Sequence, residues 1–83
     1  MDVKILGTGC PNCKRLEKVT RQALAEMGVE ASVTKVTALA DIMSYDIMST
    51  PGLVIDEQVV SSGRIPSKAD VTSMIATALM NEG

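Results

Sequence analysis

Residues 3–13 read Val-Lys-Ile-Leu-Gly-Thr-Gly-Cys-Pro-Asn-Cys, and they indicate a strand that passes through a loop into a helix. The apolar run at 3–6 is typical of a short buried strand, and the glycines on either side of Thr8 end it. With Cys10 at the N-cap, Pro11 takes the first helical position, where its missing N–H is not needed. The stretch therefore predicts a strand-to-helix start with two cysteines at the beginning of the helix.

The following residues, 11–27, have the spacing of an amphipathic helix. Glu17 and Arg21 form a favourable i,i+4 pair on its polar side. Gly28 stands where a left-handed C-terminal cap belongs. The apolar stripe that we expect to face the core consists of Leu16, Val19, Thr20, Ala23, Leu24 and Met27.

The middle of the chain predicts a strand and a second helix. Residues 30–36 alternate and are rich in β-branched side chains, which favours a strand. Thr37 is a suitable N-cap for a helix over residues 38–48. The side chains that we expect this helix to turn inward are Leu39, Ile42, Met43 and Ile47.

The last third predicts two strands and a helix. The strands are expected at 52–55 and 59–61, around a turn at 56–58 whose type the sequence leaves open. Ser67 and Asp70 resemble a capping box at the start of a helix over 67–80. We interpret most of the methionines as core filling, on or beside apolar stripes: Met27, Met43, Met74 and Met80.

The resulting order, β-α-β-α-β-β-α, predicts an α/β fold of three layers. We expect three helices to cover both faces of a four-stranded mixed sheet. The two β-α-β units predict parallel pairing with right-handed crossovers, and the hairpin adds an antiparallel strand. The chain has no repeat, linker or low-complexity stretch, so we expect residues 1–83 to form a single domain.

The composition excludes several classes of function. Eight basic against ten acidic residues and a single aromatic, Tyr45, provide neither a phosphate-binding charge nor a stacking platform, so nucleic acid is not an expected partner. We interpret Tyr45 as a partly buried packing residue with a hydrated hydroxyl. The absence of histidine excludes Ser–His and Cys–His catalysis. No signal peptide or membrane span is evident, so we expect a cytoplasmic protein that does not bind membranes.

Cys10 and Cys13 concentrate the chemistry at one place. Thiols are kept reduced in the cytosol, so a CxxC pair there favours a redox or metal role over a structural disulfide. The positive end of the helix, with Lys14 and Arg15 nearby, favours the Cys10 thiolate. A large lowering of its pKa requires direct N–H or thiol donation to the sulfur. We therefore expect Cys10 to attack a substrate disulfide and the deeper Cys13 to resolve the mixed disulfide.

Two other functions are compatible with the same cysteines. A small carrier could bind Cu(I) or another heavy metal through the two thiolates, although such carriers have the order β-α-β-β-α-β and end in a strand. A closed zinc site is not predicted, because the chain offers no further cysteine or histidine. The third alternative is a non-catalytic adaptor. We expect neither a bound metal nor a cofactor.

Three segments together carry a family resemblance: Gly9-Cys10-Pro11-Asn12-Cys13, Ser49-Thr50-Pro51-Gly52-Leu53-Val54-Ile55-Asp56 and Ser62-Gly63-Arg64-Ile65-Pro66. With them the chain resembles the small thioredoxin/glutaredoxin-like redox-active disulfide proteins of archaea and bacteria. The resemblance implies a thioredoxin fold without extra N-terminal elements and a cis Thr50–Pro51 bond packed against the active-site disulfide. It also implies that the Thr50 backbone pairs with an extended substrate segment and that Pro51 limits access to the sulfurs.

The resemblance thus implies an enzyme or electron carrier that reduces protein disulfides and is itself restored by an upstream reductase. We expect it to be a monomer. We expect Pro11 and Asn12 to contact substrate together with Thr50 and Pro51. The sequence departs from thioredoxin proper in having Gly9 before the first cysteine and Pro11-Asn12 between the two. Lys4 lies in the first strand, where thioredoxin has a buried acid, so the proton acceptor for Cys13 is not identified.

Overall fold

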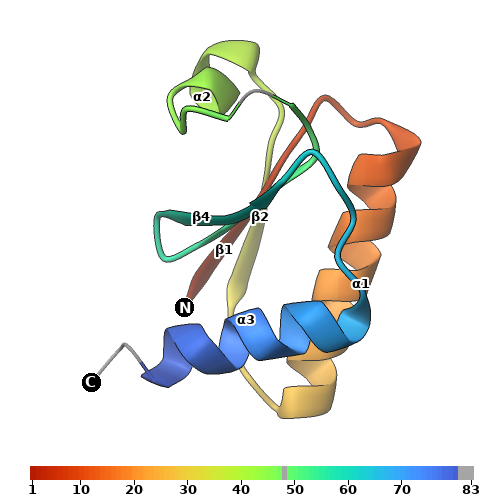
Figure 1. Ribbon diagram of the computed structural model, residues 1–83, viewed down its shortest axis with the longest axis vertical. Helices are drawn as coiled ribbons and strands as arrows, with labels where there is room; N and C mark the ends of the chain where they lie inside the picture. Colours follow the sequence, from red (N-terminus) through yellow and green to blue (C-terminus); the bar gives the residue numbers. More distant parts are fainter. Residues whose placement is uncertain (48, 81–83) are drawn as a thin grey trace.

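The computed structural model describes residues 1–47 and 49–80, and its element order is the predicted one. The fold is α/β, with four strands in one mixed sheet and three helices (Figure 1). In chain order the elements are β1 (Asp2–Leu6), α1 (Pro11–Met27), β2 (Ser32–Val36), α2 (Leu39–Met43), β3 (Gly52–Ile55), β4 (Gln58–Ser62) and α3 (Lys68–Met80).

The strand order in the sheet is β2-β1-β3-β4. β1 pairs in parallel with β2, whereas β3 is antiparallel to both β1 and β4. The expectation of two parallel β-α-β units is therefore wrong for the second one. A helix of five residues rises only about 7.5 Å, so α2 does not carry the chain back along the sheet. The chain enters β3 from the end at which it left β2.

One face of the sheet is covered by α1 and α3, which pack against each other in Figure 1. The core on this side draws on both helices and on the two central strands. Its fully buried members include Leu16 from α1 and Ile75 from α3. Met27 and Met74 pack against the edge of this core, as predicted. α3 begins with the expected capping box, because Asp70 N–H donates to Ser67 Oγ (3.1 Å) and Ser67 N–H donates to Asp70 Oδ2 (3.3 Å).

The other face is covered by α2, which in Figure 1 lies away from the other two helices. Its core is small: Leu6, Ile42 and Val54 are buried, and Val36, Tyr45 and Ile47 pack around them. α2 is half the predicted length, and its N-cap is Ala38 without a side-chain hydrogen bond, so the expected Thr37 cap is wrong.

Two side chains of α2 that were expected to point inward are exposed. Leu39 is 65% exposed and Met43 is 63% exposed. A helix of fewer than two turns presents only one residue, Ile42, squarely to the sheet. Met80, at the end of α3, is also exposed rather than core filling, and Met48 lies outside the described residues.

The turn between β3 and β4 is a two-residue hairpin turn. Asp56 and Glu57 have φ of 49° and 68°, and positive φ at both positions is what a type I′ turn requires. Neither residue is the glycine or asparagine that such turns prefer, which is why the sequence left the turn type open. Within the described residues, no helix is both long and apolar enough to cross a membrane.

Candidate active site

The two cysteines lie at the end of the sheet where β1 passes into α1. Gly7 N–H continues the parallel pairing by donating to Val36 O (3.0 Å), after which the chain turns toward the helix. Cys10 is the N-cap of α1, with φ −68° and ψ 162°, and Pro11 follows at the start of the helix. The predicted capping position of Cys10 is confirmed.

The Cys10 sulfur serves as the capping group itself. Cys13 N–H donates to Cys10 Sγ at 3.3 Å, so the i,i+3 spacing places the second cysteine directly behind the first. Both are free thiols. Cys10 is partly exposed, whereas Cys13 is only 5% exposed. One sulfur is therefore accessible to a partner, and the other is adjacent to it but covered.

The two thiols have opposite pKa shifts. Hydrogen bonds to the sulfur from the Cys13 thiol, and then from the backbone N–H groups of Cys13 and Asn12, lower the pKa of Cys10. Burial, followed by the hydrogen bond to Cys10, raises the pKa of Cys13. The lowering of the Cys10 pKa comes from direct donors to the sulfur, the kind of contact that the sequence analysis named.

Gly7 is the residue that lets Cys13 fit. A Cβ on Gly7 would overlap the Cys13 Sγ and come within 3.2 Å of its Cβ. Close packing of this kind leaves no room for a side chain between the end of β1 and α1. The sequence analysis treated Gly7 only as a strand terminator. The available signal was a glycine directly after the strand and three residues before the first cysteine.

The Thr50–Pro51 bond is cis, as the resemblance implied. Leu6 pairs with Gly52 at the end of the β1–β3 ladder, so Pro51 lies across from Gly7 and at the same end of the sheet as the cysteines. Pro51 is buried and Thr50 is exposed. Their predicted contact with substrate stays a prediction.

The loop after β4 contacts the segment that contains Pro51. Gly63 N–H donates to Pro51 O (2.9 Å), and Gly63 has a φ of +74° that L-residues rarely adopt. A Cβ there would also overlap Ser49 Oγ. Gly63 was quoted in the resemblance without a role, and the structure shows that it holds the 49–51 segment in place.

A small cavity of about 50 Å³ opens beside the buried cysteine. It provides room for a water molecule next to polar groups. None of its lining residues is a carboxylate, so no acid contacts Cys13 from this side. The lining residues are Ile5, Gly7, Gly9, Cys13, Lys14, Lys35 and Thr37.

Lys4, the residue in place of the expected acid, faces away from this cavity. Its neighbour Ile5 lines the cavity, and successive side chains of a strand point to opposite faces. Lys4 Nζ donates to Tyr45 Oη (2.9 Å) and forms an ion pair with Glu57, whose other oxygen accepts from Tyr45 Oη (3.1 Å). These contacts raise the pKa of Lys4 far above its usual range. Tyr45 is partly buried as predicted, but its hydroxyl is bound by two side chains.

The element order is not that of the metal carrier considered as the alternative, because the chain enters a helix after the second strand and α3 follows the hairpin. In the described part of the chain, no group of three or more His, Cys, Asp or Glu side chains is placed to hold a metal ion. A metal at the CxxC pair would have two thiolates as its protein ligands from these residues.

A mixed sheet with helices on both faces, two adjacent thiols at a helix N-terminus and a cis proline at the same end define a thioredoxin-like redox protein. A family model described as a thioredoxin domain matches residues 1–76, and the chain belongs to this family.

Curated relatives agree with the family. The chain is 34% identical to a thioredoxin of Methanothermobacter thermautotrophicus over 76 residues, covering 92% of this chain and 99% of the relative. It is 32% identical to a thioredoxin of Methanocaldococcus jannaschii over 77 residues, covering 93% and 88%. The structure of thioredoxin 1 from Thermosipho africanus superposes with a TM-score of 0.62 over 99% of this chain and 98% of that one, at 16% identity, which shows the fold.

The family and its two close cysteines show that the protein is a thiol–disulfide oxidoreductase. Its partners are accordingly proteins with disulfides to be reduced and a reductase that restores the dithiol.

Proposed function

We propose that the protein reduces disulfides of other proteins, with Cys10 as the attacking thiolate and Cys13 as the resolving thiol. The observation that carries the assignment is the contrast between the two sulfurs. Cys10 is partly exposed and has a lowered pKa, whereas Cys13 is buried and has a raised pKa. A nucleophile must be both accessible and ionised, and only Cys10 meets the two conditions.

The reaction takes two exchanges. The Cys10 thiolate attacks one sulfur of the target disulfide, which forms a Cys10–target mixed disulfide and releases the other target sulfur as a thiolate that takes up a proton. Cys13 then loses its proton and attacks Cys10 Sγ, which releases the second target thiolate. The target gains two electrons, and the protein is left with a Cys10–Cys13 disulfide for the reductase.

The first exchange itself prepares Cys13 for the second. Two of the causes that raise the pKa of Cys13 are its hydrogen bond to Cys10 and the charge of that sulfur. Both disappear when Cys10 becomes part of a neutral mixed disulfide, so the pKa of Cys13 falls at that moment. We propose that its proton leaves through the adjoining cavity, past Thr37 and Lys35, in place of a buried acid.

Substrate would bind along the rim of the site. Pro11 and Asn12 are exposed beside Cys10, and Thr50 is exposed at the start of the cis bond. We propose that the Thr50 backbone pairs with an extended segment of the target. The buried Pro51 then keeps other groups from reaching the sulfurs. We further propose that residues 1–83 act as one domain, as a monomer in the cytoplasm, without binding nucleic acid or membranes.

The test is a single-turnover reaction with a disulfide-bonded peptide, followed by mass measurement. Cys10→Ser is expected to abolish reduction, and Cys13→Ser is expected to accumulate the mixed disulfide at Cys10. The two variants are matched, because each removes one sulfur and retains a hydroxyl. If Cys13→Ser released both peptide thiols in this reaction as fast as the unmodified protein, the dithiol mechanism would be wrong.

The pH dependence of alkylation tests the thiolate assignment. Because its pKa is lowered, Cys10 is expected to react with iodoacetamide at a midpoint pH below that of an ordinary thiol, and Cys13 to react only above it. Cys13→Ala removes the side-chain donor and is expected to move the Cys10 midpoint upward. Cys13→Ser keeps a donor and is expected to move it less. Equal midpoints in the two variants would contradict the role of the side-chain donor.

A further inference from the structure

The charges on α1 are not distributed in the way that stabilises a helix. Cations stabilise the C-terminal end of a helix and anions the N-terminal end. In α1 the first turn contains no acidic residue and the last turn no basic one. Four exposed basic side chains lie instead in the first three turns, between the fourth and the eleventh of its 17 residues: Lys14, Arg15, Lys18 and Arg21. Helix stability therefore does not account for their placement.

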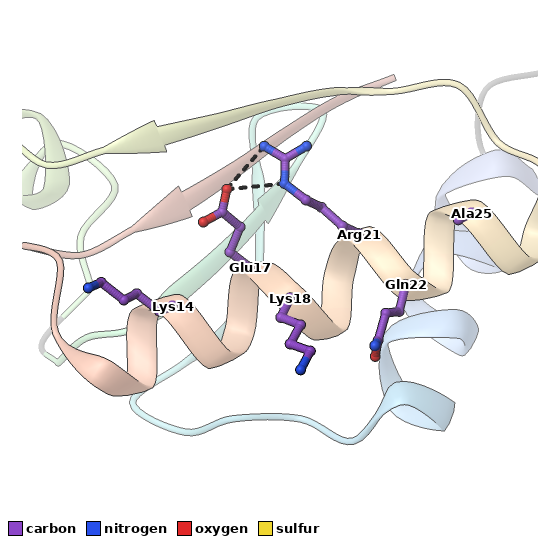
Figure 2. Close-up of a pocket in the computed structure, with 6 residues that line it drawn as sticks. All are labelled: Lys14, Glu17, Lys18, Arg21, Gln22 and Ala25. Atoms are coloured by element: carbon purple, nitrogen blue, oxygen red, sulfur yellow. Dashed lines mark hydrogen bonds and ion pairs between the residues drawn. The ribbon is translucent and has the colours of Figure 1, made fainter.

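Between Lys14 and Arg21 the only acidic residue is Glu17, and two ion pairs balance its charge. Glu17 is 16% exposed and pairs with Arg21 (3.0 Å) from its own helix and with Lys35 (3.5 Å) from β2. Figure 2 shows Glu17 meeting Arg21, while Lys14 and Lys18 point away from the helix. We call the surface formed by the four basic residues of α1 and Lys35 the basic face. It begins one turn from Cys10.

The basic face contrasts with the rest of the chain. It holds five of the eight basic residues and, in Glu17, one of the ten acidic residues. The remainder of the chain has three basic and nine acidic residues, which accounts for the overall charge of −2. A protein with a net negative charge thus presents a concentrated positive surface beside its redox site.

Stabilisation of the Cys10 thiolate does not require the whole face. Lys14 and Arg15 are within the first turns, but Lys18 and Arg21 are about 12 and 16 Å from Cys10 along the helix axis. These separations exceed the screening length of about 8 Å at physiological ionic strength, so the two cations act little on the thiolate.

We propose that the basic face docks an acidic surface next to the disulfide of a redox partner. This inference rests on the proposed function and adds the charge of the partner to it. Opposite charges that flank the reacting groups raise the rate of productive encounter and select among partners. The Cys10 thiolate is itself negative and would by itself favour a basic substrate, so a preference for acidic partners can only come from the surrounding cations.

The experiment uses three synthetic peptides of equal length, each with one internal disulfide flanked by glutamates, lysines or glutamines. Their rates of reduction by the protein are measured at low and high ionic strength. At low ionic strength we expect the acidic peptide to react on the order of tenfold faster than the basic one, and the difference to vanish at high salt.

Matched variants locate the effect. Lys18→Glu and Lys68→Glu change the net charge equally, but Lys68 lies at the start of α3 and pairs with Glu26 near the other end of α1. Lys18→Glu is expected to slow reduction of the acidic peptide several-fold and to leave the rate for the glutamine peptide unchanged. Lys68→Glu is expected to leave both rates nearly unchanged. Lys18→Gln is the second variant, in case charge reversal prevents folding.

The outcomes separate this inference from the proposed function. Equal rates for acidic and basic peptides, a faster basic peptide, or equal losses in the two variants would overturn the docking role of the basic face. If the unmodified protein failed to reduce the glutamine peptide at all, the proposed function itself would be wrong.

Discussion

On one face of the sheet, helices of 17 and 13 residues pack over a continuous core, whereas the other face has a helix of five residues over three buried side chains. The large α1/α3 face holds Cys13 and anchors the start of α1. The small α2 face adjoins the 49–51 segment that we expect to meet substrate. The difference indicates that the α1/α3 face supplies most of the buried core and fixes the sulfurs, while the α2 face is lightly packed and is expected to be the less rigid of the two.

The same truncation on both faces tests this comparison most strongly. Ile75→Ala, in the α1/α3 core, is expected to lower the free energy of unfolding by about 3–5 kcal/mol, because the rigid surroundings cannot fill the cavity. Ile42→Ala, under α2, is expected to cost about 2–3 kcal/mol, because the short helix can settle into the space. Urea denaturation measures both. A loss at Ile42 as large as that at Ile75 would contradict the proposed difference in rigidity.

Substitution of two glycines at the end of the sheet is expected to lower the free energy of unfolding by a smaller amount. A methyl group on Gly7 meets the Cys13 sulfur, which α1 holds in place, so Gly7→Ala is expected to cost about 1–3 kcal/mol. A methyl group on Gly52 would lie 2.9 Å from the end of the half-buried Ile47 side chain. Because that side chain can move, Gly52→Ala is expected to lower the free energy of unfolding by less than about 1 kcal/mol.

Alkylation of Cys13 distinguishes the two glycine variants further. The rate of Cys13 alkylation should change in Gly7→Ala, where the new methyl group presses on the sulfur, and stay the same in Gly52→Ala. The reverse ranking of the two variants, in stability or in alkylation, would show that α2 is the more rigid side.

The N-terminal caps of α3 and α2 are also expected to contribute unequally to stability, with the larger contribution from α3. Ser67→Ala removes half of the capping box of α3 and is expected to cost about 1 kcal/mol. Thr37→Ala at the start of α2 is expected to change stability by less than about 0.5 kcal/mol, because no side chain caps that helix. Thermal melting of the two variants is a sufficient measurement. A clear loss in Thr37→Ala would mean that Thr37 caps α2 in solution.

The smallest expected effect concerns two methionines. Met43→Gln is expected to change the free energy of unfolding by less than about 0.5 kcal/mol, because the side chain is largely exposed on α2. Met74→Gln, on α3, is expected to cost about 1 kcal/mol, because that side chain packs against the larger core. Denaturant titration compares them. If Met43→Gln cost more than Met74→Gln, the α2 face would be covered in solution.

Local patterns were sufficient for much of the fold and the site. The 3.6-residue period of α1, its Gly28 cap and its Glu17–Arg21 pair depend on residues within four positions of one another, and the structure contains each of them. The placement of Cys10 at the N-cap, one turn before Cys13, follows from the same short-range rules.

Features that depend on distant residues were missed. The period of residues 39–47 resembles that of a longer helix, but α2 ends at Met43, and Asp46 has a φ of 59° that a right-handed helix does not contain. Lys4 contacts Tyr45 and Glu57, which are 41 and 53 positions away, so no local pattern indicates these partners. The overlap that Gly7 avoids exists only once α1 has docked on β1.

The order of residues along the chain was enough to determine α1, α3, the four strands and the pair of adjacent thiols, because caps and periodicity act between near neighbours. The direction of β3, the exposed flank of α2, the room for the Cys13 sulfur and the meeting of Pro51 with Gly63 were decided by the assembled sheet. Strand pairing and close packing join segments that the chain itself holds far apart, and their geometry exists only in the folded molecule.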